Sequence, residues 1–235
     1  MMFRRGAKSD IIGGLDVGST ALRIAIGQLV PVGERVELHI IGAAEAPSEG
    51  VHRGVVTSID DTVSSISACL EKAERMTGIP IEHVWVGISG NQIISAESKG
   101  VVAVSKANGE ITEEEMERAI EAARMVATPL NYEILHVIPK SYTVDGQVGI
   151  KDPTGMTGVR LEVDTQIIQG LTSQIKNLTK AIYRTKLDID DLVLSILANS
   201  EAAVTEKQKE LGVAIINLGG ATTSLVVFEE GDLLD

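Results

Sequence analysis

Alternating apolar and polar positions near the start of the chain predict a β-hairpin with a tight corner. Apolar residues dominate 11–17 and 21–27, and Gly18-Ser19-Thr20 separates the two runs. Such a turn presents backbone N–H groups and two hydroxyls, which together can hold a phosphate. Asp16 lies directly before the corner. Its carboxylate would reach a Mg²⁺ ion through a bound water rather than contact the phosphate, because two anions repel.

A third strand and a long helix follow. The strand is predicted at 36–46 and the helix at 58–77, where apolar or small side chains recur every three or four residues. Gly78 and Pro80, directly after the helix, are typical stop signals. Residues 1–80 are therefore predicted to form a first block of antiparallel strands and a helix.

Residues 81–166 change character and predict a small α+β insertion. Strands are expected at 84–90, 100–104, 132–139, 141–144 and 160–170, with a glycine-rich loop before the last of them. A helix is expected over 112–127, and Thr112 with Glu115 fits a capping box at its start. Trp85 is assigned to the core.

The pattern then returns to alternating helices and strands, which favours an α/β sheet that continues the first block. Helices are predicted at 173–185 and 200–210, and strands at 190–197, 213–217 and 225–228. A second corner between the last two strands contains Gly219, Gly220, Thr222 and Thr223. Two similar hairpins far apart in the chain predict two half-domains that face one another and hold a polyphosphate between their corners.

Composition narrows the classes of partner. The 235 residues carry a formal net charge of −12, whereas nucleic-acid binding needs a basic face. Cys69 is the single cysteine, so no internal disulfide can form and a reducing, cytoplasmic setting is expected. No run approaches the roughly 20 apolar residues that span a bilayer, and no signal peptide is predicted before the first strand.

The inserted block also contains a segment that resembles a known family. Residues 144–162 read VDGQVGIKDPTGMTGVRLE, which closely resembles a segment of the FtsA family of bacterial cell-division proteins. VGISG at 86–90, HVIP at 136–139 and ELGV at 210–213 are similar to neighbouring motifs of that family. The resemblance runs from about residue 11 to the end of the chain.

The resemblance implies an α/β fold of the actin-like, ribonuclease H-like type with an inserted SHS2-type subdomain. It divides the chain into 1–80, the first part of subdomain 1A; 81–166, the inserted subdomain 1C; 167–210, the second part of 1A; and 211–235, an incomplete start of subdomain 2A. Because such proteins continue well beyond this point, the chain is expected to be a fragment. The alternative is a short variant completed by a partner chain.

The resemblance also implies a function. Such proteins bind ATP and Mg²⁺, form actin-like filaments and link the FtsZ ring to the cytoplasmic membrane through a C-terminal helix that this sequence lacks. Asp16, Gly18, Ser19 and Thr20 would hold the nucleotide together with the second corner. Residues 81–166 would contact other division proteins, and FtsZ would bind the missing half. The implied protein is a cytoplasmic scaffold, peripheral on the inner face of the membrane.

Several residues depart from the family pattern in a direction that weakens nucleotide binding. Ala21 stands where a lysine is usual, and Asn217, Ala221 and Ser224 replace an aspartate, a glycine and an aspartate of the second hairpin. Ser195 stands where catalytic members of the superfamily orient the attacking water, and an unaided serine is not a strong general base. We therefore expect no catalytic residue and at most slow ATP hydrolysis.

Two other functions stay open at this point. A pilus-assembly actin homologue of the PilM kind shares the fold and an insertion of the same class, although the segment at 144–162 favours FtsA. A phosphotransferring enzyme, such as a sugar or acetate kinase, would need a carboxylate base that faces a substrate pocket.

Overall fold

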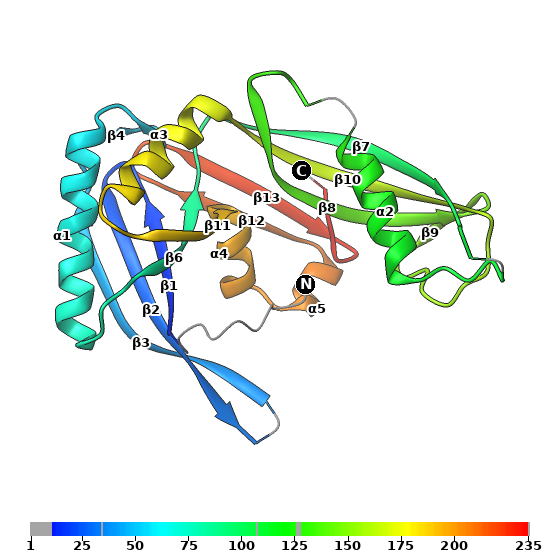
Figure 1. Cartoon of the computed structure of the whole chain (residues 1–235), viewed down its shortest axis with the longest axis horizontal. Coiled ribbons are helices and arrows are strands. Elements are labelled where there is room, and N and C mark those ends of the chain that lie inside the picture. The colour runs from blue at the N-terminus through cyan, green and yellow to red at the C-terminus, as the bar shows by residue number, and fades with distance from the viewer. Residues whose placement is uncertain (1–10, 34, 107, 126–127, 235) are drawn as a thin grey trace. The chain divides into compact units, whose positions relative to one another are not determined.

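The computed structural model describes residues 11–33, 35–106, 108–125 and 128–234, and its contacts group the chain into two compact units (Figure 1). The first unit contains Met1–Asn91, Gln174–Ala202 and Ile216–Ser224, and the second contains Gln92–Ser173, Ala203–Ile215 and Leu225–Asp235. No helix within the described ranges is long and apolar enough to cross a membrane.

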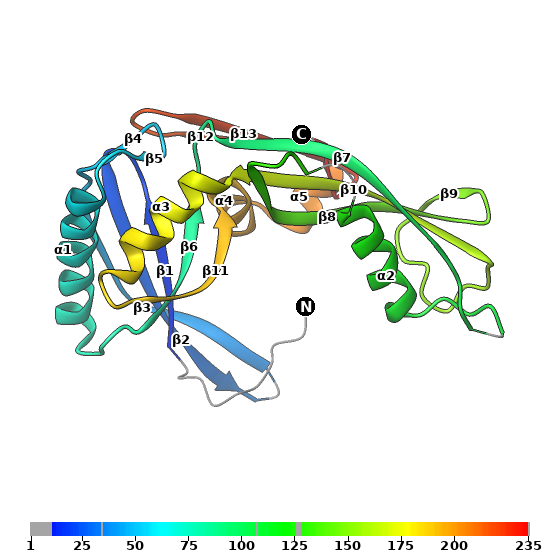
Figure 2. The same cartoon turned by 45° about the horizontal axis from the view of Figure 1, so that its top comes forward.

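The first unit is built on a five-stranded mixed sheet with the strand order β11-β6-β1-β2-β3. Its strands are β1 (Ile11–Val17), β2 (Ala21–Val32), β3 (Arg35–Pro47), β6 (His83–Ile88) and β11 (Asp188–Leu194). The β1–β2 and β2–β3 pairs are antiparallel, and β6 runs parallel to both β1 and β11. The strand predicted at 84–90 therefore belongs to the first sheet, and its assignment to the insertion at 81–166 was wrong. The unit also contains α1 (Ile59–Thr77), nearly all of α3 (Thr172–Tyr183) and α4 (Ser195–Ala203), and the short pair β4 (Val51–His52) and β5 (Val55–Val56) (Figure 2).

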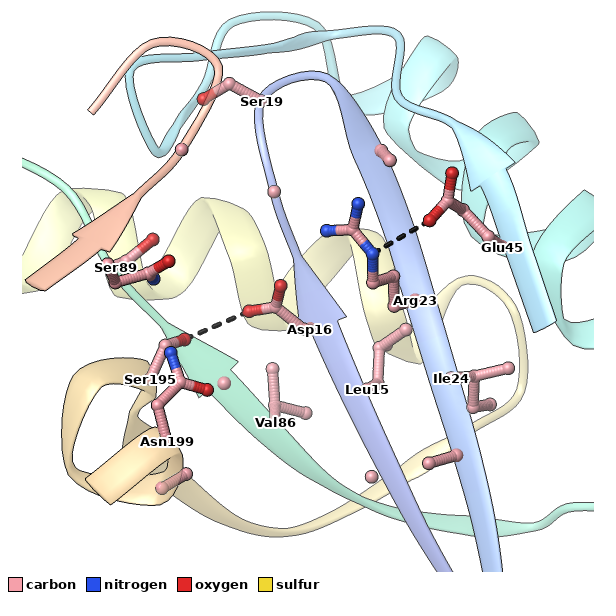
Figure 3. Close-up of a pocket in the computed structure, with 18 of the residues that line it drawn as sticks. Leu15, Asp16, Ser19, Arg23, Ile24, Glu45, Val86, Ser89, Ser195 and Asn199 are labelled. Atoms are coloured by element: carbon pink, nitrogen blue, oxygen red, sulfur yellow. Dashed lines mark hydrogen bonds and ion pairs between the residues drawn. The ribbon is translucent and has the colours of Figure 1, made fainter. Parts of the chain in front are cut away.

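One face of this sheet packs against helices and the other carries polar and small side chains. Along β2 the buried residues are Leu22, Ile24 and Ile26, and the exposed residues between them are Arg23 and Ala25. Helix α1 packs on β2 and β3 from the buried side, and Figure 3 shows α1 and α3 behind the sheet. The opposite face is therefore available for binding.

Helix α1 confirms the helix predicted at 58–77. The Ser58 hydroxyl caps its start by accepting a hydrogen bond from the Asp61 N–H at 3.4 Å. Gly78 ends it in the left-handed conformation, with φ of 70°, and donates its N–H to the Glu74 carbonyl. A residue without Cβ adopts this conformation at no steric cost.

Two predictions after α3 were wrong. The strand predicted at 190–197 ends at Leu194, and Ser195 begins α4. A short apolar run such as this one has no period that separates a strand from a helix. The single helix predicted at 200–210 is two helices, because Thr205 caps a new one, α5 (Glu206–Leu211), and forms a capping box with Gln208.

The second unit contains an antiparallel four-stranded sheet with the order β7-β10-β8-β9. Its elements are β7 (Ile93–Ala103), α2 (Glu113–Arg124), β8 (Tyr132–Val144), β9 (Gln147–Ile150) and β10 (Arg160–Leu171). β7 and β10 pair along their whole length, which places Ile93 opposite Gly170. Helix α2 packs so closely on β7 that a Cβ at Gly100 would lie 1.9 Å from the Ala119 carbonyl oxygen. The core between them contains Ile111, Ala119, Ala123, Tyr142, Val144, Leu161 and Val163.

Several strands of this sheet are longer than predicted. The strand predicted at 100–104 begins at Ile93, because β10 pairs with β7 throughout and keeps its polar residues in the ladder. The segments predicted at 132–139 and 141–144 form the single strand β8, with a bulge at Lys140. The bulge lies next to Pro139, which has no N–H to donate to the ladder.

The glycine-rich loop and the end of the predicted helix also differ. Strand β9 forms inside that loop, because Asp145 and Gly146 have φ of 48° and 90° and fold it back on β8. Asp-Gly between two strands is a strong hairpin signal. The helix predicted over 112–127 ends at Arg124, and positions 126–127 lie outside the described residues. Its predicted capping box is confirmed.

The second corner lies in a three-stranded sheet formed by β12 (Val213–Leu218), β13 (Thr223–Glu229) and β14 (Asp232–Leu233). The predicted hairpin is confirmed. Strand β14 was not predicted, because only two residues pair in it. The turn of this hairpin belongs to the first unit.

Candidate functional site

A cavity of about 900 Å³ opens on the face of the first sheet that lies opposite α1 and α3, and both glycine corners line it (Figure 3). The predicted residues that line it are Asp16, Gly18, Ser19, Thr20, Gly219, Gly220 and Thr222. Thr223 does not line the cavity and begins β13 instead. The structure thus gathers most of the predicted site around one space.

The first corner is shaped by Gly18 and anchored by Ser19. A Cβ at Gly18 would lie 2.6 Å from the Ala21 carbonyl oxygen, so the turn requires glycine. The Ser19 Oγ accepts a hydrogen bond of 2.9 Å from the Gly54 N–H, in the turn between β4 and β5. Because a hydroxyl can donate as well as accept, the Ser19 hydroxyl can still donate a hydrogen bond to a ligand while its oxygen is held by Gly54.

The second corner packs directly against the first. The Gly219 N–H donates to the Thr222 carbonyl at 2.9 Å and closes the turn. A Cβ at Gly220 would lie 2.2 Å from the Thr20 Cγ2 atom, so the two chain segments approach as closely as only glycine allows. Residues 200 positions apart in the sequence therefore meet at one end of the cavity.

Asp16 lines the cavity and accepts a hydrogen bond from Ser195. The Ser195 hydroxyl donates to the Asp16 Oδ1 atom at 3.0 Å, and Figure 3 shows the two side chains pointing toward one another. Gly87 on β6 makes room for this pair, because a Cβ there would lie 2.8 Å from the Ser195 Oγ. The sequence pointed to Ser195 but not to this contact, because it placed Ser195 in a strand rather than at the start of α4.

A row of charged side chains crosses the sheet beside the corner. Arg23 lies opposite Asp16 on β1 and opposite Glu45 on β3. The Arg23 Nε donates to the Glu45 carboxylate at 2.8 Å, and both side chains are more than half exposed. Among the described lining residues Arg23 is the one cation. Arg23 was not among the predicted site residues, although alternation along β2 from Ala21 already places it on the same face.

Small residues and one aromatic form the rest of the cavity wall. Gly14, Ala25 and Ala43 leave the sheet surface flat, and Trp85 lies along β6. Trp85 was predicted to lie in the core, but it is half-buried and lines the cavity. The neighbouring Val84 and Val86 are fully buried, so the alternation of the strand turns Trp85 to the open face.

The donor set fits a phosphate better than a metal held by protein alone. Gly18 and Gly220 leave no room for a Cβ, and two corners rich in N–H groups and hydroxyls suit an anion. In residues 11–33, 35–106, 108–125 and 128–234, no group of three or more His, Cys, Asp or Glu side chains could hold a metal ion. A Mg²⁺ ion at Asp16 would therefore take most of its oxygen ligands from phosphate and water.

Comparison with known proteins identifies relatives over nearly the whole chain. A profile described as "SHS2 domain inserted in FTSA" matches residues 90–169. The cell division protein FtsA of Bacillus subtilis is 41% identical over 219 residues, which are 93% of this chain and 49% of that protein. The FtsA of Escherichia coli is 32% identical over 223 residues, 95% of this chain and 52% of that protein.

Solved structures show the same fold at lower identity. The PilM–PilN type IV pilus biogenesis complex matches with a TM-score of 0.63 and 17% identity, covering 95% of this chain and 60% of that chain. The ethanolamine utilization protein EutJ from Carboxydothermus hydrogenoformans matches with a TM-score of 0.50 and 11% identity, covering 98% of this chain and 52% of that chain. These neighbours confirm the predicted actin-like α/β fold.

The profile match and the curated relatives point to the same family as the sequence motifs. The chain spans about half the length of the curated relatives it matches. The segment at 144–162, which carried the resemblance, lies inside the matched SHS2 domain. The chain therefore belongs to the FtsA family of bacterial cell division proteins and contains that family's SHS2 domain.

Proposed function

We propose that this chain binds ATP with Mg²⁺ in the cavity lined by its two glycine corners. The observation that carries the proposal is the close packing of Gly220 on Thr20, which brings both hairpins to one space above Asp16. Phosphate groups would lie against the N–H groups and hydroxyls of the two corners. Asp16, held by Ser195, would bind the metal through a water molecule.

In the cell, the protein would act as an FtsA-like, filament-forming scaffold that links the FtsZ ring to the cytoplasmic membrane. The relatives named for cell division support this role. Within the predicted range 81–166, the residues after β6 would act as subdomain 1C and contact other division proteins, and β6 would belong to subdomain 1A together with 1–80 and 167–210. Residues 211–235 would be the start of 2A. Contacts with FtsZ and with the membrane would fall to the part of the relatives' length that this chain does not span.

The bound nucleotide would act by favouring one conformation of the protein, and not as the substrate of a reaction. The Ser195 hydroxyl donates a hydrogen bond to Asp16 and so is not placed as a base toward water. Asn217 and Ala221 line the cavity at the positions where the family pattern has an aspartate and a glycine. Turnover of ATP is therefore expected to be slow or absent.

A pilus-assembly role of the PilM kind is the second candidate, because the PilM–PilN complex has the same fold. Sequence identity of 32–41% to cell division proteins, against 17% to that complex, favours the FtsA role. A small-molecule kinase is the third, and a coupled assay with polyols and carboxylic acids would detect it. Phosphorylation of any such substrate would argue against the scaffold.

ATP binding can be tested by titrating a fluorescent ATP analogue into the protein in the presence of Mg²⁺. Asp16→Ala should weaken binding at least roughly tenfold, since it removes a charged partner of the metal. Asp188→Ala is a matched control, because Asp188 is exposed and lies at the far end of β11 outside the cavity lining. Equal affinity of both variants and the parent would overturn the assignment of the site.

A further inference from the structure

The outer half of β3 is an exposed sheet edge. β3 ends the strand order of the first sheet and pairs with β2 alone among the described strands. Its side chains at Val36, Leu38 and Ile40 are 61%, 54% and 63% exposed. We call Val36–Ile40 the edge segment. A free edge of this kind presents backbone N–H and C=O groups that can pair with another chain.

The edge segment differs from the inner half of β3. A register shift at Ile41 separates the two halves. In the inner half, Gly42 lies against Thr77 and Met76 at the end of α1, so one face of the strand is covered there. Features that protect edges, a bulge and a proline at Pro47, lie at Ile41 or in the inner half. The edge segment itself contains neither proline nor lysine.

The two faces of the edge segment have different chemistry. On one face, Leu38 packs over Gly27, and Val36 and Ile40 lie beside it at alternate positions. On the other face lie Glu37 and His39, whose side chains approach one another to 3.4 Å. One face is thus apolar, and the other carries one acid and one base.

We propose that a second copy of this chain pairs antiparallel with the edge segment, with a two-fold axis at Leu38. In this register Leu38 faces the partner's Leu38, Val36 faces the partner's Ile40, and Glu37 faces the partner's His39. All three exposed apolar side chains then pack against apolar side chains, and each acid meets a base. Cross-strand pairs of these kinds stabilise antiparallel sheets.

Neighbouring registers lack this match. A slip of one residue sets Leu38 opposite the partner's Glu37 and mixes the two faces. A slip of two residues sets Glu37 opposite the partner's Glu37 in one direction and His39 opposite the partner's His39 in the other, so in neither case does an acid face a base. The pairing requires neither nucleotide nor the cavity, so its failure would leave the proposed ATP site untouched, and the reverse also holds.

Cysteine cross-linking tests the register directly. Leu38→Cys places two thiols directly opposite one another, where Cβ atoms of paired strands lie close enough for a disulfide under mild oxidation. Val36→Cys is the matched control on the same face, because its thiols would lie about four residues, or roughly 13 Å, apart. Cys69 is fully buried and stays in both variants. Mixing Val36→Cys with Ile40→Cys should restore the cross-link.

We expect most of the Leu38→Cys protein to become a covalent dimer and the Val36→Cys protein to stay monomeric. A monomeric Leu38→Cys protein would overturn the pairing. Equal cross-linking of Leu38→Cys and Val36→Cys would overturn the register, since random collision or another alignment would then explain it. Thermal unfolding of each variant checks that the fold is intact, which is expected at such exposed positions.

A charge swap provides an independent test without thiols. Glu37→Arg should shift the protein toward monomer in sedimentation equilibrium, because it sets arginine against the partner's His39. The double variant Glu37→His with His39→Glu restores acid against base and should recover the dimer. A double variant no more dimeric than the single one would contradict the proposed facing of these residues.

Discussion

At the scale of single residues, the site depends on glycines that pack so closely against neighbouring atoms that no side chain would fit. Gly18, Gly87 and Gly220 each face an atom that a Cβ would meet at 2.2–2.8 Å. These contacts bring the first corner, β6 and the second corner together around Asp16. The site is therefore sensitive to the smallest possible substitution at these positions.

Gly87→Ala should lower the free energy of unfolding by about 1–3 kcal/mol, because the added Cβ overpacks the space between β6 and α4. It would also displace the Ser195 hydroxyl from Asp16, so nucleotide binding should weaken as well. Urea unfolding measures the first effect. Gly14→Ala is the control, since it lines the same cavity but its Cβ would meet only the Ala25 carbonyl at 3.9 Å. A loss of equal size in both variants would contradict the packing argument.

Arg23→Ala should weaken ATP binding roughly tenfold or more, because it removes the one cation among the described lining residues. The stability should change by less than about 1 kcal/mol, since the ion pair with Glu45 is exposed. Glu45→Ala breaks the same ion pair but keeps the guanidinium, so its affinity should not fall. Calorimetric titration of the two variants separates a phosphate ligand from a purely structural pair.

At the scale of elements, α2 shows how one side chain can hold a helix start. The Glu115 carboxylate is fully buried and accepts hydrogen bonds from the Thr112 hydroxyl, the Ser105 hydroxyl and the Thr112 N–H. These bonds, with that of the Thr112 hydroxyl first, lower the pKa of Glu115 from 4.5 to about 2. The charged carboxylate is therefore part of the folded structure of the second unit.

The pH dependence follows from the direction of this shift. Because the pKa of Glu115 is lower in the folded state, its contribution to stability is complete above pH 4.5 and is lost as the pH falls toward about 2. Glu115→Gln has no such proton to bind. It should be less stable than the parent at pH 6, and the difference between the two should shrink between pH 4.5 and 2. Thermal unfolding across this range measures it, and a constant difference would exclude a role for the charge.

At the scale of the whole molecule, local signals predicted some parts of the fold and long-range pairing decided others. The helix at 58–77 was predictable because Ser58 and Gly78 mark both of its ends. The length of β7 was not predictable, because the polar residues of β7 stay in the sheet only through their pairing with β10. Gly-Ser-Thr and Gly-Gly corners predicted the cavity, whereas Arg23 and the Ser195–Asp16 bond depend on neighbours in the folded chain.

The pairing of Ile93 with Gly170 has a consequence for how such a protein can change over time. The chain therefore enters and leaves the SHS2 segment at neighbouring positions. An insertion whose two ends lie next to each other can be replaced, shortened or deleted without a change in the path of the flanking chain. The SHS2 domain of this family can therefore diversify while the hairpin corners and the sheet beneath them stay the same.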